Sequence, residues 1–337
     1  MMIDIKTTDP TPEIEYANVS RKIWIEYLRL VGVLGVITIH ATARYFNDFR
    51  NIGLYDWMFA NILNAFSRFS VPIFVMISGC VLLGRNYGIR DFYIKRGIRI
   101  IPPFIFWSLF YIGFDYYFND KPLILILSNF ICSGKAAGHL WYLPLVICLM
   151  LFTPFINNYT IGKRPSLEDY IYMLVIFSLF MLLNQIVTVG YAVFNLKIDW
   201  SIKSFHWYIG YFIMGYFISV YYDKIPIGNI TTIIILGVLL IFGSAMNFYS
   251  ASTLGIIKDW FVLDNAGILN FMVSLCIFYL FSKNRDLFKD SHLISSMASM
   301  SFGIYLIHLA FLSLFSHYMP LNTLDRIIYI PFPLLSG

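Results

Sequence analysis

Glu26, Arg29 and His40 lie inside an apolar segment, Trp24–Tyr45, that is long enough to cross a bilayer. Arg29 and His40 are eleven residues apart. On a helix they therefore share a face to within roughly 20° and lie about 16 Å apart along the axis. Glu26 comes three residues before Arg29, a spacing at which opposite charges pair. Because charged groups at membrane depth usually face a protein interior or a water-filled path, this face predicts a functional site.

The chemistry that this face could perform is proton transfer. Histidine, with an ordinary pKa of about 6.5, exchanges protons near neutral pH, so His40 is a candidate general base. The alternative is that Glu26 and Arg29 form an interfacial ion pair while His40 packs against a neighbouring helix. Snorkelling explains Arg29, but it does not explain a histidine flanked by Thr38 and Thr42.

The composition indicates a polytopic membrane protein. Hydrophobic residues make up 59% of the chain and charged residues 13%, against roughly 25% charged residues in soluble domains. The mean hydropathy is +0.71. We therefore expect an all-α fold embedded in the lipid bilayer. The net charge of +5 needs no nucleic-acid partner, because most Lys and Arg residues can be placed in loops on one side.

About ten transmembrane helices are expected. Lys121–Lys135 is apolar but short, which favours a re-entrant or interfacial helix. We expect a bend in the second span at Pro72, and an incomplete tenth helix after Arg326. The first nine spans are expected at Trp24–Tyr45, Tyr55–Gly84, Ile100–Phe118, Gly138–Asn157, Tyr170–Phe194, Trp207–Tyr222, Thr231–Tyr249, Trp260–Ser282 and Met300–Tyr318.

Basic residues predict the orientation in the membrane. The loop Arg85–Arg99 contains Arg85, Arg90, Lys95, Arg96 and Arg99. Short basic loops are cytoplasmic, so the N-terminus two spans earlier is expected to be cytoplasmic as well. Residues 1–22 lack the apolar core of a signal peptide. They are expected to form a cytoplasmic tail, followed by one membrane domain over residues 23–337.

Three other positions could serve a site within the membrane. Arg68 is about fourteen residues into the second span and cannot easily reach either surface; the alternative is a packing role. His139 opens the fourth span with Trp141 and Tyr142, which an interfacial aromatic belt would also show.

Tyr305 and His308 form the third such position, because they are three residues apart in the ninth span and share a helix face. The alternative is that this pair only pins two helices together.

Five short motifs occur in order along the chain. They are Glu26-Tyr27-Leu28-Arg29 with His40, Ser67-Arg68-Phe69-Ser70-Val71-Pro72, Tyr93-Ile94-Lys95-Arg96-Gly97-Ile98-Arg99, His139-Leu140-Trp141-Tyr142-Leu143, and Ser301-Phe302-Gly303-Ile304-Tyr305-Leu306-Ile307-His308. Together they resemble acyltransferase family 3, a family of bacterial membrane O-acyltransferases. The chain is similar to the branch that acetylates surface polysaccharides, including enterobacterial common antigen.

The resemblance implies transfer of an acetyl group from cytoplasmic acetyl-CoA to a sugar hydroxyl of a surface polysaccharide or lipid-linked glycan, at the bacterial inner membrane. By the family pattern, His40 is the essential histidine and Arg29 is the arginine eleven residues before it. Arg96 and Arg99 match an arginine pair before the third span. Leu30 departs from the pattern, because the family usually has Gly or Ala there. The incomplete last helix is a second departure.

The residues suggest a division of roles. Arg96 and Arg99 can bind the CoA phosphates, since guanidinium groups suit phosphate oxygens; the alternative is that these basic residues only set the orientation in the membrane. Arg68 could stabilise the oxyanion or orient His40. Glu26 would support Arg29. The residues expected to contact substrate are His139, Trp141, Tyr142, Tyr305 and His308.

Covalent and metal chemistry are not expected. The four cysteines have no basic neighbour in sequence that would activate them, and neither zinc spacing nor a disulfide framework is visible.

Two other classes of protein have similar features. An exporter or permease for polysaccharides or lipid-linked sugars would also be polytopic, with polar residues in its spans. It would release no CoA from acetyl-CoA. A non-catalytic partner in a glycan synthesis complex would tolerate replacement of His40 with alanine.

Overall fold

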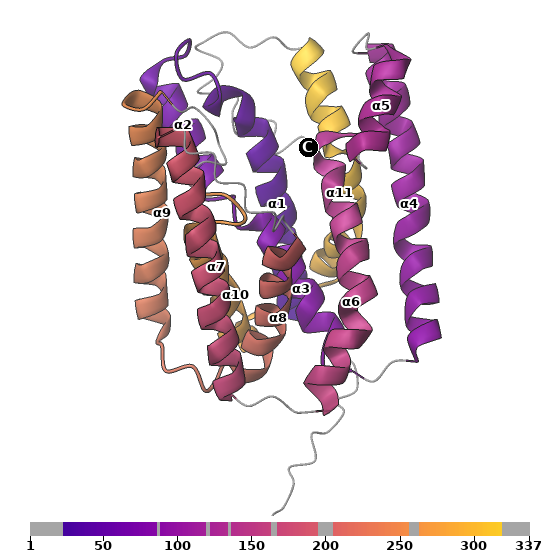
Figure 1. Cartoon of the computed structure of the whole chain (residues 1–337), viewed down its shortest axis with the longest axis vertical. Helices are drawn as coiled ribbons and strands as arrows, with labels where there is room; N and C mark the ends of the chain where they lie inside the picture. The colour runs from indigo at the N-terminus through magenta and orange to yellow at the C-terminus, as the bar shows by residue number, and fades with distance from the viewer. Residues whose placement is uncertain are drawn as a thin grey trace, which may run out of the picture.

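The structure is a computed structural model that describes residues 23–85, 88–118, 122–133, 136–162, 167–194, 205–255 and 263–318. Within this part of the chain all regular structure is helical, and no strand occurs. The all-α expectation is therefore confirmed. Most of the long helices, including α4, α6, α7 and α9, run along the long axis of the molecule (Figure 1).

The helices follow one another along the described part of the chain. They are α1 (Ile23–Phe46), α2 (Leu54–Ala65), α3 (Ser70–Leu82), α4 (Ile89–Phe118), α5 (Leu123–Ser133), η1 (Gly138–Trp141), α6 (Tyr142–Gly162), α7 (Leu167–Phe194), α8 (Phe205–Tyr221), α9 (Asn229–Ser252), α10 (Ile268–Lys283), η2 (Arg285–Leu287) and α11 (His292–Tyr318).

The protein is a multi-pass membrane protein. In the described part of the chain, six segments are long and apolar enough to cross a membrane, and three shorter apolar helices lie at 170–179, 208–221 and 268–283. The count of about ten spans is not confirmed. The tenth helix, expected after Arg326, lies outside the described residues. The six segments are Ile23–Phe46, Leu54–Leu82, Ile89–Phe118, Gly138–Asn157, Asn229–Ser252 and His292–Phe315.

The second span is broken into α2 and α3, not bent at Pro72. The break covers residues 66–69, and Pro72 lies in the first turn of α3. A proline has no N–H to donate to the carbonyl four residues earlier, which here belongs to Arg68. The Asn270 side chain on α10 donates to that carbonyl instead, at 3.1 Å. The break is therefore stabilised by a partner that is distant in sequence.

The basic segment before the third span is mostly helix, not a loop. α4 already begins at Ile89 and continues through Pro102 and Pro103. Lys95 is exposed, whereas Arg96 on the next position is partly buried. A helix can extend beyond the apolar layer with its basic side chains in water, so charge alone did not mark where the helix begins. The short helix expected within Lys121–Lys135 is present as α5.

Two further boundaries differ from expectation. The eighth span was expected from Trp260, but residues 263–267 form a turn before α10, closed by a hydrogen bond from the Gly267 N–H to the Asp264 carbonyl. Trp260 lies outside the described residues. The ninth span was expected from Met300, but α11 begins at His292. The serine-rich sequence at that point did not predict a helix, but polar contacts stabilise one there.

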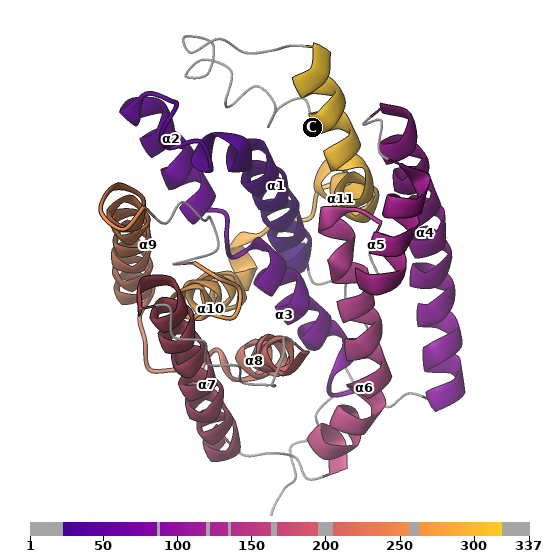
Figure 2. The same cartoon turned by 45° about the horizontal axis from the view of Figure 1, so that its top comes forward.

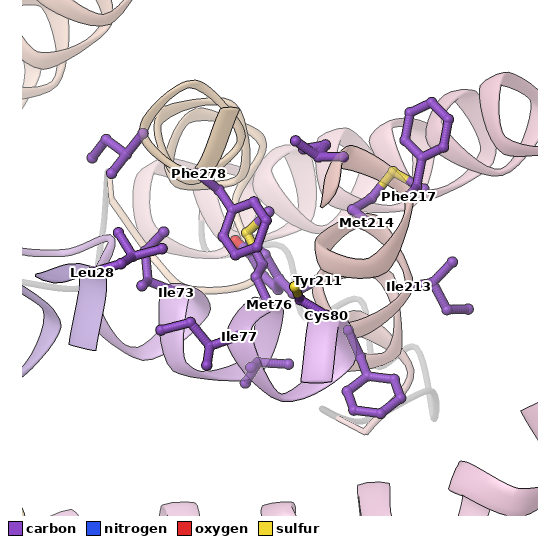
Figure 3. Close-up of a cluster of buried hydrophobic side chains, with 14 of the residues drawn as sticks. Leu28, Ile73, Met76, Ile77, Cys80, Tyr211, Ile213, Met214, Phe217 and Phe278 are labelled. Atoms are coloured by element: carbon purple, nitrogen blue, oxygen red, sulfur yellow. The ribbon is translucent and has the colours of Figure 1, made fainter. Parts of the chain in front are cut away.

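The core of the fold lies where α3 meets α8, beside α1 and α10 (Figure 2). Figure 3 shows Met76 and Cys80 of α3 among side chains of α8 and α10, such as Tyr211 and Phe278. The close approach depends on glycine. A Cβ added at Gly79 would lie 1.7 Å from the Phe212 carbonyl oxygen. Small residues let helix backbones approach in membranes.

Replacing Gly79 with valine is expected to destabilise the fold. The new side chain would meet backbone, which cannot move aside as a flexible side chain does, and overpacking costs about 1–3 kcal/mol or more. We expect a lower thermal midpoint and less monodisperse protein after detergent extraction. Gly113 on α4 is the matched control, because a Cβ there has nothing within 4 Å. Equal stability of the G79V and G113V variants would contradict this account of the α3–α8 contact.

Candidate active site

Helices α1 and α11 run side by side in the same direction. Near their starts, the Ser295 hydroxyl on α11 donates to the Glu26 carboxylate on α1 at 2.7 Å. Further along, the rings of His40 and His308 are 5.1 Å apart. From the first contact to the second, the residue numbers rise along both helices, which requires a parallel pair. The sequence-predicted face of α1 is therefore lined along its length by α11.

A cavity of about 320 Å³ opens beside the first half of α1. Three arginines line it: Arg29 from α1 and Arg96 and Arg99 from α4. Arg29 and Arg96 are partly buried and Arg99 is exposed. The remaining lining residues are Glu26, Phe74, Ile77, Ser78, Val81, Leu82, Ile100, Tyr142, Leu143, Val146, Met150, Ser295, Ala298, Ser299, Ser301, Phe302 and Tyr305.

The cavity combines cationic and apolar surfaces. Three guanidinium groups contribute positive charge from two helices, while side chains such as Phe74, Val146 and Phe302 provide an apolar wall. Arginine binds phosphate oxygens with planar, paired donors. The arrangement suits a molecule with an anionic group at one end and an uncharged chain at the other.

A cluster of three histidines lies beyond the cavity. The rings of His40 on α1, His308 on α11 and His139 on η1 form a chain, in which His308 lies 5.1 Å from His40 and 5.0 Å from His139. His139 is 2% exposed and His308 is 1% exposed, while His40 is partly exposed. None of the three is among the residues that line the cavity.

Tyr305 connects the cavity to the histidine cluster. It lines the cavity, and its ring lies 5.5 Å from that of His139 and 5.9 Å from that of His308. Its hydroxyl donates to the His139 carbonyl. Tyr142, another lining residue, packs edge-on against Tyr305 at 5.7 Å and is hydrogen-bonded to Ser78. Tyr305 therefore forms the part of the cavity wall that contacts the imidazoles, and Tyr142 packs beside it.

The aromatic-belt alternative does not fit His139. Its ring is buried among Tyr111, Tyr305 and His308, whereas a belt residue would face the membrane interface. Trp141 packs against Tyr208 of α8, with ring centroids 5.7 Å apart. Trp141 also lies edge-on to Tyr142 of the cavity wall, at 6.3 Å between ring centroids, but Trp141 itself does not line the cavity.

Arg68 lies in a polar network at the break between α2 and α3. It is 9% exposed, and its Nε donates to the Asn64 side chain at 2.8 Å. Asn64 in turn donates to the Thr42 hydroxyl on α1 at 3.2 Å. Arg68 is close enough to act electrostatically on His40 and on Asp264. The structure therefore brings Arg68 to the deep end of the α1 face, near the histidine rather than in the cavity.

Several residues of this region were not predicted from the sequence. The Tyr111 hydroxyl on α4 donates to the Leu306 carbonyl at 2.8 Å, and its ring lies 5.0 Å from that of His139. Tyr111 is one of many aromatic residues in an apolar helix, so its type carried no signal. Ser295, Asn64 and Asn270 were missed as well. Asparagine inside an apolar segment is itself costly, so the sequence did contain an indication that Asn64 has a polar partner.

A family model described as an acyltransferase domain, that of acyltransferase family 3, matches residues 22–336. The chain belongs to acyltransferase family 3. Neither the search of curated proteins nor the search of solved structures found a significant match. The family match covers nearly the whole chain and supports a membrane acyltransferase, so the cavity and the histidine cluster of this acyltransferase are its candidate active site.

Proposed function

We propose that this family member is a membrane O-acetyltransferase. It would move an acetyl group from cytoplasmic acetyl-CoA to a sugar hydroxyl of a surface polysaccharide or lipid-linked glycan, in the bacterial inner membrane, as the enterobacterial common antigen branch does. The observation that carries the proposal is the cavity that is lined by Arg29, Arg96 and Arg99 and also by Tyr305, which packs against the histidine cluster.

His40 acts as the general base in this proposal. The acceptor hydroxyl oxygen attacks the thioester carbonyl carbon while His40 takes the hydroxyl proton. The carbon–sulfur bond then breaks, and the proton passes to the thiolate of CoA. The partly exposed position of His40, next to buried His308, is compatible with access of an acceptor to its ring.

The arginines divide between the two ends of the site. Arg96 and Arg99 bind the CoA phosphates at the cytoplasmic end, so the phosphates stay out of the apolar layer. Arg29 lies deeper, beside Glu26, and extends the cationic path toward the acyl group. Arg68 lies near His40, where its guanidinium orients the base or balances charge that develops on the carbonyl oxygen.

The proposal requires the N-terminus and the start of α4 to be cytoplasmic. A cysteine placed at Gly88, in a variant whose four native cysteines are replaced by alanine, is expected to resist a membrane-impermeant maleimide in intact cells. It should react after the cells are permeabilised. Ready labelling from outside would place the arginines of the cavity on the wrong side for a cytoplasmic donor.

A transfer assay tests the function. Purified protein in lipid nanodiscs is incubated with acetyl-CoA labelled in the acetyl group and with a glycan extract from a strain that lacks this gene. Release of CoA together with label in the glycan is the expected result. A transporter would release no CoA, and that outcome would overturn the proposal in favour of the exporter.

A further inference from the structure

The buried ring of His308 has a defined tautomer. Its Nδ1 lies 2.6 Å from the Tyr305 carbonyl oxygen. A carbonyl oxygen can only accept, so Nδ1 carries the proton, and in a neutral ring Nε2 is then an acceptor. Nε2 is buried and has no hydrogen-bond partner among the described residues.

His139 shows the same pattern with its nitrogens exchanged. Its Nε2 lies 3.2 Å from the Leu306 carbonyl oxygen, so Nε2 donates. Nδ1 is then the acceptor, and it too is buried without a partner in the described part of the chain. Leaving a buried acceptor unsatisfied costs about 1–3 kcal/mol. Two such acceptors in neighbouring rings need an explanation.

A helix-pinning role accounts for part of His139 but not for His308. The His139 ring joins η1 to α11 through the Leu306 carbonyl, and that bond is sufficient for a structural contact. The hydrogen bond of His308 stays within its own helix, so it joins nothing. A metal is also not indicated, because no group of three or more His, Cys, Asp or Glu side chains in the described residues is placed to hold one.

The two acceptors lie next to the proposed base. His308 is 5.1 Å from His40 and 5.0 Å from His139, measured between ring centroids. A hydroxyl group has one proton to donate, and the reacting hydroxyl gives its proton to His40. If the acceptor molecule also supplies the donor for His308 or His139, that donor is therefore a different group, close to the reacting one.

We propose that His308 and His139 form a subsite that recognises a second hydrogen-bond donor, a hydroxyl or an amide N–H, on the carbon next to the acylated hydroxyl. This inference rests on the proposed O-acetyl transfer and narrows the acceptor to sugars with such a neighbouring donor. A polar site rejects an analogue that lacks its hydrogen bond because the buried acceptor then stays unsatisfied.

The test uses a matched pair of acceptors. Nuclear magnetic resonance of the acetylated glycan identifies the modified sugar, and its octyl glycoside is prepared with and without the neighbouring donor. Wild-type protein is expected to use the intact glycoside with about 10- to 100-fold higher kcat/KM, the equivalent of one lost hydrogen bond. His308→Leu should remove this preference, whereas His308→Gln, which offers an amide oxygen, should keep part of it.

Two controls separate the possible failures. His292→Gln changes an exposed histidine on the same helix and should leave the preference unchanged. The KM for acetyl-CoA should stay near the wild-type value in every variant, which reports that the donor site is folded. Equal use of the two glycosides by the wild-type protein would overturn the subsite alone. Absence of any acetyl transfer would overturn the proposed function and the subsite with it.

Discussion

Replacing His40 with glutamine is expected to lower acetyl transfer by about 10²–10⁴-fold, which is the usual contribution of general acid–base catalysis. Glutamine keeps a hydrogen-bonding group of similar reach but cannot take a proton. His40→Ala should lose at least as much activity. The measurement is single-turnover transfer from acetyl-CoA to glycan in nanodiscs at saturating donor, so that changes in donor binding do not affect the measured rate.

The matched control for His40 is again His292→Gln, because His292 is exposed and does not line the cavity. Acetyl-CoA affinity should be close to normal in both His40 variants, because the arginines of the cavity are unchanged. If His40→Gln turned over at a near-normal rate, the ring would have a packing role against His308, and the general base would have to be sought elsewhere.

Changing both Arg96 and Arg99 to alanine is expected to weaken acetyl-CoA binding by at least about 100-fold. Each guanidinium that contacts phosphate contributes a charge-assisted hydrogen bond of about 1.5–3 kcal/mol, and both side chains line the same cavity. Calorimetric titration with CoA measures the loss directly. The variant should still insert in the membrane, because other basic residues on the same side maintain the orientation.

Arg90 and Lys95 supply a control of equal charge. Both are exposed on α4 and lie outside the cavity lining. Replacing this pair with alanine removes two positive charges from the same helix without touching the cavity. Similar losses in the two double variants would mean that Arg96 and Arg99 act only through net charge, or only through topology.

Much of the architecture could be predicted without a structure. Long apolar segments in a chain with few charges require helices, because lipid offers the backbone no hydrogen-bond partner. For that reason α1, α9 and η1–α6 lie close to their expected positions. The helix face shared by Arg29 and His40 follows from spacing alone.

Helix boundaries were harder to predict, because local sequence does not show what a distant residue supplies. The break before Pro72 leaves the Arg68 carbonyl without a local donor, and Asn270 provides one from α10. α4 and α11 extend past the apolar stretch into basic and serine-rich sequence. At the start of α11, Ser295 bonds to Glu26 of α1.

The sequence by itself determined the membrane-embedded helical class, the family and the residue types that can do chemistry, since these depend on composition, spacing and motif order. Only the tertiary structure decided that His40, His139 and His308 meet, because α1, η1 and α11 are far apart in the chain. The hydrogen bond between His139 and Leu306, for example, joins residues that are 167 positions apart. It also decided which nitrogens of His139 and His308 remain available, because the backbone carbonyls that set the tautomers are positioned by packing.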